Sequence, residues 1–224
     1  MTFEIAVLDM AGTTVADDGL VEKAFSDAIG HLGFHAGDDR YATMLDYVRT
    51  TMGESKIAVF RALLGEETLA QQANAAFEQA YGDLIDDGLC AALPGAAQAI
   101  DRLRTGGIKV ALTTGFSRVT LSRILRALDW ETVADLTLCP ADAGRGRPFP
   151  DLALAALLAL EGTEVRALVT AGDTAYDMRM GRAAGAGLVA GVLTGAHEAD
   201  QLLQAGADQV LESIASLPLL VLNH

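Results

Sequence analysis

A single carboxylate, Asp9, stands directly after the apolar run Phe3 to Leu8 and before a turn rich in glycine and threonine. Such a run is typical of a buried strand, and in an open α/β sheet ligands bind beyond the carboxyl ends of the strands. A carboxylate there can act as a nucleophile or ligate a metal, although strand-end aspartates also cap helices. The role of Asp9 therefore depends on what other strands bring to the same edge.

Two further segments carry groups that bind phosphate. One apolar run ends in Thr114 and Gly115, whose hydroxyl and backbone N–H groups can hold phosphate oxygens. A loop with two prolines carries Arg145 and Arg147, and guanidinium groups match phosphate oxygens in a bidentate manner. Taken singly, these are ordinary strand residues and solvated loop charges. Their order along the chain after Asp9 favours one shared site.

The fourth segment adds two carboxylates. Asp173 follows the apolar run Leu168 to Gly172, and Asp177 comes four residues later. Either residue alone would most often be a helix cap. Together with Asp9 they offer three carboxylates, which with water and a backbone carbonyl make the oxygen shell that Mg²⁺ prefers. The sequence therefore predicts a Mg²⁺ site beside the phosphate site.

The elements that must position these groups alternate between strand and helix from about Pro94 onward. This alternation predicts an α/β fold in which helices cover both faces of a parallel sheet. After the first strand, the predicted strands cover residues 109–114, 136–139, 167–171, 188–193 and 208–210, and the predicted helices cover 96–105, 118–127, 152–160, 178–184 and 197–205.

Residues 20–90 show helical periodicity without a convincing strand, with helices predicted over 20–32, 41–51, 55–64 and 68–85. We therefore predict a core domain of residues 1–15 and 92–224, interrupted by an all-helical domain of residues 16–91. An insertion after the first strand emerges at the ligand-binding edge of the sheet, so we expect it to act as a cap over the site.

Composition narrows the classes of partner. A formal net charge of −14 disfavours nucleic acid and acidic membrane surfaces as partners. No apolar run approaches the length of a membrane span, and no basic leader with a cleavage site is visible, so we expect a cytoplasmic protein. Two cysteines, Cys90 and Cys139, make no disulfide framework and read as free thiols.

The ordered motifs Asp9-x-Ala-Gly-Thr, Thr114-Gly115, Arg147-Pro and Gly172-Asp173-x-x-x-Asp177 resemble the haloacid dehalogenase superfamily. The resemblance implies a Rossmann-like core, with Asp9 as the nucleophile that forms an aspartyl-phosphate. It implies Mg²⁺ bound by Asp9, Asp173 and the Ala11 carbonyl, with Asp177 nearby. The residues it implies for phosphate or substrate binding are Gly12, Thr13, Thr114, Gly115 and Arg147.

Most phosphatases of that superfamily carry an acid two residues after the nucleophile, where this chain has Ala11, which cannot transfer a proton. Residues 9–15, 113–116, 146–150 and 172–178 instead resemble the phosphonatase branch, phosphonoacetaldehyde hydrolase. That branch carries a lysine in Met-Gly-x-x-Lys, which matches Met52, Gly53 and Lys56. The resemblance adds Met52 and Gly53 to the substrate-binding residues, and a homodimer formed through the cap.

A lysine suits cleavage of a carbon–phosphorus bond, which expels a carbanion. Condensed with a neighbouring carbonyl, the amine makes an iminium that takes up the electron pair as an enamine. The amine must be partly neutral, so we expect burial or nearby positive charge to lower the pKa of Lys56. The alternative is a solvated charge on a cap helix.

Three positions depart from the branch: Val59, Phe116 and Leu20 stand where it usually has a histidine, an aromatic hydroxyl and a cysteine. We therefore predict a phosphonatase-like hydrolase that cleaves a 2-oxoalkylphosphonate, either phosphonoacetaldehyde or a relative. One alternative is a phosphatase or phosphoryl-transfer enzyme acting on a small phosphorylated metabolite. Another is a non-catalytic phosphate-binding protein, which the complete set of carboxylates disfavours.

Overall fold

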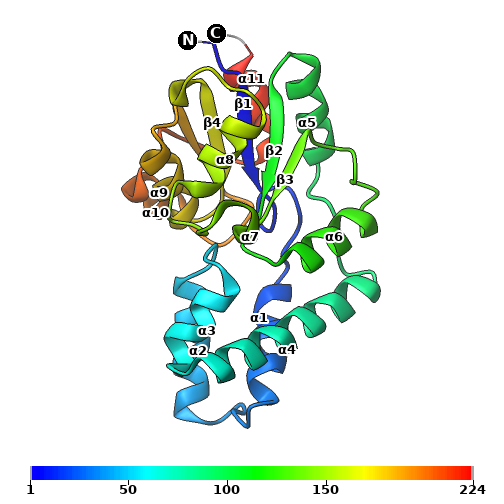
Figure 1. Cartoon of the computed structure of the whole chain (residues 1–224), viewed down its shortest axis with the longest axis vertical. Coiled ribbons are helices and arrows are strands. Elements are labelled where there is room, and N and C mark those ends of the chain that lie inside the picture. The colour runs from blue at the N-terminus through cyan, green and yellow to red at the C-terminus, as the bar shows by residue number, and fades with distance from the viewer. Residues whose placement is uncertain (1, 223–224) are drawn as a thin grey trace.

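Six parallel strands form one sheet in the computed structural model, which describes residues 2–222. The order across the sheet is β3-β2-β1-β4-β5-β6, and helices cover both faces (Figure 1). The predicted α/β architecture with a parallel sheet is therefore confirmed. The strands are β1 (Ile5–Asp9), β2 (Lys109–Thr113), β3 (Leu136–Leu138), β4 (Leu168–Gly172), β5 (Leu188–Val192) and β6 (Gln209–Leu211).

Strand β1 lies between β2 and β4, and all five of its residues are buried. Asp9 pairs with Thr113 at the end of β2, and Leu8 pairs with Ala171 near the end of β4. The register therefore brings the ends of three strands, and the polar residues that follow them, to one edge of the sheet.

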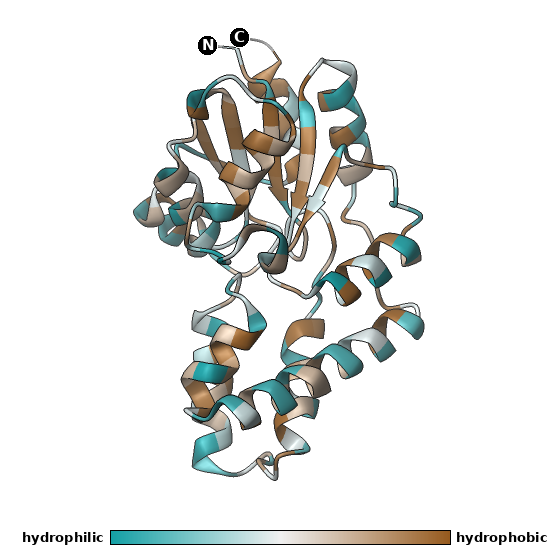
Figure 2. Cartoon of the chain, viewed as in Figure 1, coloured by the Kyte–Doolittle hydropathy of each residue, from teal (hydrophilic) through white to brown (hydrophobic). Residues whose placement is uncertain are grey.

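Alternate residues of β1 pack on opposite faces of the sheet, as the strand period of two requires. Ala6 and Leu8 join the larger core cluster, whereas Ile5 and Val7 join the cluster under α8. Figure 2 shows the strands as apolar and the outer faces of the helices as hydrophilic. The helices around the sheet are α5 (Ala96–Thr105), α6 (Arg118–Ala127), α7 (Pro140–Ala143), α8 (Asp151–Ala159), α9 (Ala175–Ala184), α10 (Ala199–Ala205) and α11 (Leu217–Val221), with short 3₁₀ turns η1 (Val165–Ala167) and η2 (Ile214–Ser216).

Of the five helices between β1 and β2, the first four lie together beyond the carboxyl end of the sheet (Figure 1). Their shared core is aromatic: Phe60 stacks on Phe25 with ring centroids 5.2 Å apart and meets the edge of Phe77 at 6.1 Å. The division into domains of residues 1–15 with 92–224 and 16–91 stays a prediction. The four helices are α1 (Leu20–Gly30), α2 (Asp39–Thr50), α3 (Lys56–Leu64) and α4 (Glu67–Asp86).

Two sets of contacts join these helices to the sheet layer. The chain segments that enter and leave them pair with each other, because Ala16 N donates to Ala91 O at 2.9 Å and Leu93 N donates to Thr14 O at 3.0 Å. Farther out, Glu78 of α4 accepts a hydrogen bond of 2.5 Å from the Ser117 hydroxyl, at the start of α6. The helices are thus held to the sheet layer at two separate places.

Helix α9 begins at Ala175, three residues before the predicted start. Thr174 and Asp177 form a capping box, in which each side chain bonds the backbone N–H of the other. The short helices α7 and α11 were not predicted, because four or five residues carry too little periodicity to be recognised. None of the helices within residues 2–222 combines the length and apolar composition that crossing a lipid bilayer requires.

Candidate active site

The turn after β1 is built around one carbonyl oxygen. The backbone N–H groups of Thr13, Thr14 and Val15 all donate to Met10 O, at 2.8–3.0 Å. Gly12 takes a φ of 87°, and a Cβ there would lie 2.5 Å from Asp173 Oδ2, so only glycine lets the turn approach β4 this closely. The turn thus fixes the tip of β1 against the tip of β4.

Three buried carboxylates meet at this edge. Asp9, Asp173 and Asp177 each offer an oxygen, and these oxygens all lie within 4.8 Å of one another. The Thr13 hydroxyl donates to Asp173 Oδ1 at 3.0 Å, and Ala196 N donates to Asp173 Oδ2 at 2.8 Å. Asp173 is therefore held rigidly at the centre of the edge.

The guanidinium of Arg147 lies between the other two carboxylates. Its Nη2 is 2.5 Å from Asp9 Oδ1, and its Nη1 is 2.8 Å from Asp177 Oδ1. Burial nevertheless raises the pKa of Asp9 from 3.8 to about 7, against the opposing effect of Arg147. Burial also raises the pKa values of Asp173 and Asp177.

The donor set fits a divalent cation. Three carboxylates face one guanidinium, so the cluster keeps a surplus of negative charge. Asp177 Oδ1 is buried, and its ion pair with Arg147 meets no hydrogen-bond geometry within the described residues. Closely spaced carboxylate oxygens of this kind are ligands that Mg²⁺ binds, and the cluster matches the predicted metal site in composition.

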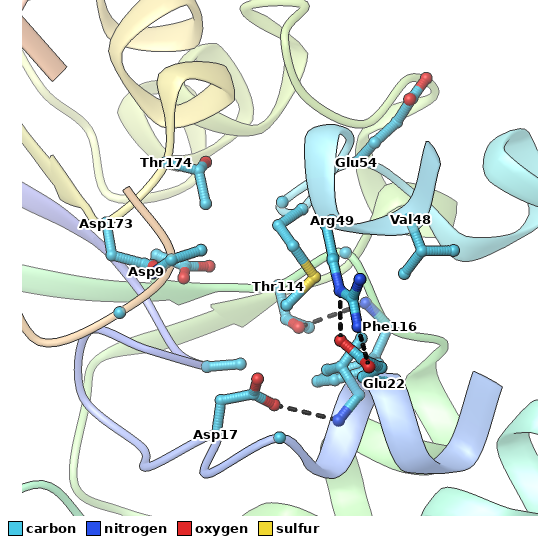
Figure 3. Close-up of a pocket in the computed structure, with 18 of the residues that line it drawn as sticks. Asp9, Asp17, Glu22, Val48, Arg49, Glu54, Thr114, Phe116, Asp173 and Thr174 are labelled. Atoms are coloured by element: carbon cyan, nitrogen blue, oxygen red, sulfur yellow. Dashed lines mark hydrogen bonds and ion pairs between the residues drawn. The ribbon is translucent and has the colours of Figure 1, made fainter. Parts of the chain in front are cut away.

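A cavity of about 550 Å³ opens over the cluster. Its inner wall comes from the sheet edge and includes Asp9, Thr114 and Asp173, and its outer wall comes from the helices α1–α3 and the segments beside them (Figure 3). The Thr114 hydroxyl accepts a hydrogen bond from Phe116 N at 3.2 Å, which orients this loop. One pocket therefore spans the sheet edge and the inserted helices.

The loop between α2 and α3 closes on the sheet edge through its backbone. A Cβ on Gly53, whose φ is 91°, would lie 2.4 Å from Thr174 Oγ1. A Cβ on Gly115 would lie 2.8 Å from Glu54 O. Glycine at both positions is what permits the contact, and it brings the neighbouring Met52 to the cavity wall.

Lys56 is the first residue of α3 and lines the same cavity. Its Nζ lies 5.5 Å from the centroid of the Phe116 ring. Burial lowers the pKa of Lys56, and the positive charge of Arg147 lowers it further, whereas the carboxylate of Asp17 opposes the shift. The direction agrees with the lowered pKa expected for an amine that reacts in its neutral form.

With this geometry established, comparison with known proteins places the chain. Residues 3–185 match the family model described as haloacid dehalogenase-like hydrolase. The chain belongs to this family. The hydrolase is 31% identical to the phosphonoacetaldehyde hydrolase of Syntrophobacter fumaroxidans over 197 residues, which cover 80% of this chain and 68% of that protein. The resemblance drawn from the motifs is therefore confirmed.

Two further relatives show how widely the similarity extends. Protein CbbY of Rhodobacter capsulatus is 26% identical to the hydrolase over 193 residues, covering 83% of each chain. The crystal structure of a phosphonoacetaldehyde hydrolase like protein from Oleispira antarctica matches with a TM-score of 0.83 at 24% identity, covering 100% of this chain and 92% of that one. The latter similarity establishes the common fold.

In the structure of the hydrolase, the residues predicted for the site lie at three kinds of position: behind the cavity wall, outside the site, or on the wall itself. Asp177, Gly12 and Thr13 lie behind the wall, where they contact Asp173 or Arg147 or hold the turn. Arg145 lies outside the site, paired with Asp151 at 2.7 Å and exposed. Those that line the cavity are Asp9, Ala11, Met52, Gly53, Lys56, Thr114, Gly115, Arg147 and Asp173.

Sequence reasoning missed two parts of the wall. The loop after β5 contributes Thr194, whose hydroxyl donates to Gly12 O at 2.7 Å, and Ala196, which bonds Asp173. Its Thr194-Gly pair follows an apolar strand just as Thr114-Gly does, so the same criterion could have found it. The segment before α1 contributes Asp17 to the wall.

Proposed function

We propose that this hydrolase is a Mg²⁺-dependent phosphonatase-like enzyme that cleaves the C–P bond of a 2-oxoalkylphosphonate, phosphonoacetaldehyde or a relative. The observation that carries the proposal is the position of Lys56. This amine shares one cavity with Asp9 and Arg147 and has a lowered pKa, while Ala11 leaves no carboxyl group two residues after Asp9. The similarity to a phosphonoacetaldehyde hydrolase supports the same substrate class.

Residues at the sheet edge bind the phosphoryl half of the substrate and react with it. Asp9 attacks phosphorus and takes up the phosphoryl group as an aspartyl-phosphate. Thr114, Gly115 and Arg147 bind the phosphoryl oxygens through hydroxyl, N–H and guanidinium donors. The ligands proposed for Mg²⁺, which when bound neutralises charge on those oxygens, are Asp9, Asp173, Asp177 and the Ala11 carbonyl.

Residues of the inserted helices bind the organic half of the substrate and react with its carbonyl group. The neutral amine of Lys56 condenses with the carbonyl group next to the C–P bond and forms an iminium. When the bond breaks, its electron pair enters the iminium and gives an enamine, so no free carbanion is expelled. Met52 and Gly53 close the wall beside the amine. This arrangement explains why an acid at position 11 is not needed.

A second candidate is a phosphatase acting on a small phosphorylated metabolite. One observation favours it: Phe116, beside Lys56, and the buried Val59, three residues after Lys56, carry no group that could assist imine formation. The two candidates differ in whether Lys56 forms a covalent bond with the substrate. Trapping that bond therefore decides between them.

The test is borohydride reduction in the presence of phosphonoacetaldehyde, with a second assay on 2-oxopropylphosphonate. The chain contains three lysines, Lys23, Lys56 and Lys109, so peptide mass mapping assigns the modified residue directly. We expect the added mass on Lys56 together with loss of activity. Lys56→Arg, which keeps the charge, should lose C–P cleavage and retain Mg²⁺-dependent hydrolysis of an aryl phosphate.

Lys23→Arg is the matched control, because Lys23 lies exposed on α1 away from the cavity wall. It should behave like the wild type in both assays. Full C–P cleavage by Lys56→Arg, or trapping on another lysine, would overturn the proposed mechanism in favour of the second candidate.

A further inference from the structure

Imine formation at Lys56 needs a second group that transfers protons. The carbonyl oxygen must gain two protons before it leaves as water, and the nitrogen must lose one. Amines and hydroxyls do this slowly without a positioned acid and base, and such a group typically contributes about 10²–10⁴-fold in rate. The proposed chemistry therefore requires a side chain near Lys56 that can exchange protons.

Phe116 and Val59 cannot serve. The ring of Phe116 lies 5.5 Å from Lys56 Nζ, and Val59 follows on the same helix face as a buried side chain. Neither carries a transferable proton. Asp9 and Asp173 belong to the carboxylate cluster around Arg147 at the sheet edge. The proposed function already assigns Asp9 as the nucleophile and both residues as metal ligands.

Four carboxylates of the outer half remain: Asp17, Asp18, Glu22 and Glu54 line the cavity. Both oxygens of Glu22 are engaged by Arg49, at 2.6 and 2.8 Å. Glu54 is engaged by the hydroxyl of Tyr176 at the sheet side of the loop. Asp18 is exposed, whereas Asp17 is half-buried and keeps one oxygen outside such pairs.

Asp17 is held in a definite orientation. Its Oδ1 accepts a hydrogen bond of 3.1 Å from Val21 N, in the first turn of α1. Figure 3 shows the hydrogen bond from the Val21 N–H to Oδ1 of Asp17, and shows Oδ2 of Asp17 pointing into the cavity. The side chain is half-buried, and burial raises the pKa of Asp17 while the ammonium of Lys56 opposes the shift. Asp17 and Lys56 are therefore electrostatic partners across the outer cavity.

We infer that Asp17 is the proton-transfer partner of Lys56 in making and hydrolysing the imine, an inference that rests on the proposed function. Protonated Asp17 gives its proton to the carbonyl oxygen as the C–N bond forms. It recovers one from the nitrogen and gives it to the hydroxyl, which leaves as water. The cavity then holds an iminium beside the carboxylate of Asp17.

The later steps return Lys56 and Asp17 to their starting states. Attack by Asp9 on phosphorus breaks the C–P bond, and its electron pair forms the C=C bond of the enamine. The enamine carbon takes a proton from solvent and becomes an iminium again. Water adds to this iminium, and Asp17 takes up the proton released when the C–N bond breaks, which regenerates the acid and the free amine.

The test compares Asp17→Asn with Asp18→Asn. Both variants keep the side-chain volume and remove one charge at adjacent positions, and asparagine can still accept the hydrogen bond from Val21 N. Asp18 is exposed, in contrast to Asp17. The measurement is the rate of borohydride-trappable imine on Lys56 with phosphonoacetaldehyde in a single turnover, across pH 5–9. Hydrolysis of 4-nitrophenyl phosphate, which needs no imine, reports on the folded sheet edge of each variant.

We expect Asp17→Asn to slow trapping about 10²-fold at the acid end of the range, with the difference narrowing as pH rises and wild-type Asp17 loses its proton. Aryl phosphate hydrolysis should be retained, and Asp18→Asn should match the wild type. If Asp17 acts through its charge alone, removing it lowers the pKa of Lys56, enlarges the neutral fraction and speeds trapping at neutral pH, which overturns the inference. Equal rates in both variants overturn it as well. Absence of trapping in the wild type instead refutes the proposed function itself.

Discussion

Replacing Asp9 by asparagine should stabilise the fold in the absence of metal, while abolishing turnover. The reason is the surplus of buried negative charge at the sheet edge. Asp9 is 5% exposed, and its nearest charges are those of Arg147, Asp173 and Asp177. Asparagine has nearly the same shape and carries no charge, so Asp9→Asn removes the electrostatic penalty without opening a cavity.

The size of the effect follows from the pKa of Asp9. Burial raises it from 3.8 to about 7 in the folded protein. A folded pKa above the unfolded value means that the folded state binds more protons, so wild-type stability falls as pH rises from about 4 to about 7. Roughly three pKa units at 1.36 kcal/mol each give about 4 kcal/mol above pH 7. For a chain of this size that corresponds to about 8–16 °C in Tm.

The assay is thermal unfolding in EDTA at pH 5 and pH 8, followed by circular dichroism. The gain in Tm for Asp9→Asn should be larger at pH 8 than at pH 5. Adding Mg²⁺ should narrow the gap, because binding to the folded wild type adds about 2.7 kcal/mol at a hundred times the Kd. Asp101→Asn, exposed on α5, is the control and should change Tm little at either pH.

Lower stability of Asp9→Asn than of the wild type at pH 8 without metal would refute the reasoning. It would mean that the contact between Asp9 and Arg147 outweighs the cost of burying the carboxylate.

Two substitutions test the cavity wall. Gly53→Ala should lower kcat/KM at least about tenfold, because its Cβ would lie 2.4 Å from Thr174 Oγ1 and push the loop off the sheet edge. Gly65→Ala, with a similar φ of 69° and open space around it, is the control that isolates backbone strain. Ala11→Asp should raise hydrolysis of an alkyl phosphate about 10²-fold, measured as phosphate release, since it restores a general acid. An unchanged rate would contradict the role assigned to position 11.

The sheet edge could be predicted because parallel strands end on the same side. Asp9, Thr114 and Asp173 each follow an apolar run. The register between β1, β2 and β4 aligns the strand ends, so these three residues lie close together. The apolar runs in the sequence and the parallel alignment of the strands therefore indicate the same site. The order of the strands did not need to be known for the metal site to be inferred.

The contacts between the inserted helices and the sheet could not be predicted in the same way. Glu78 bonds Ser117, which lies 39 residues further along, and no periodic pattern marks either residue. The position of Asp17 opposite Lys56 depends on how α1 and α3 pack through the stacked rings of Phe25 and Phe60. Such pairings arise only from tertiary packing. The domain boundaries, the cap homodimer and the cytoplasmic location stay predictions.

The central place of β1 in the sheet has a consequence for local stability. Its amide hydrogens pair with strands on both sides and lie under a fully buried layer, so they exchange with solvent only when the whole domain unfolds. Lys56 is instead the first residue of a nine-residue helix, whose first turn is held by bonds from Ala58 N and Val59 N to Ser55 O at the helix end. The two halves of the site should thus differ in hydrogen-exchange protection, because the carboxylate is anchored on a buried central strand and the amine at the end of a short helix, where backbone hydrogen bonds open more readily.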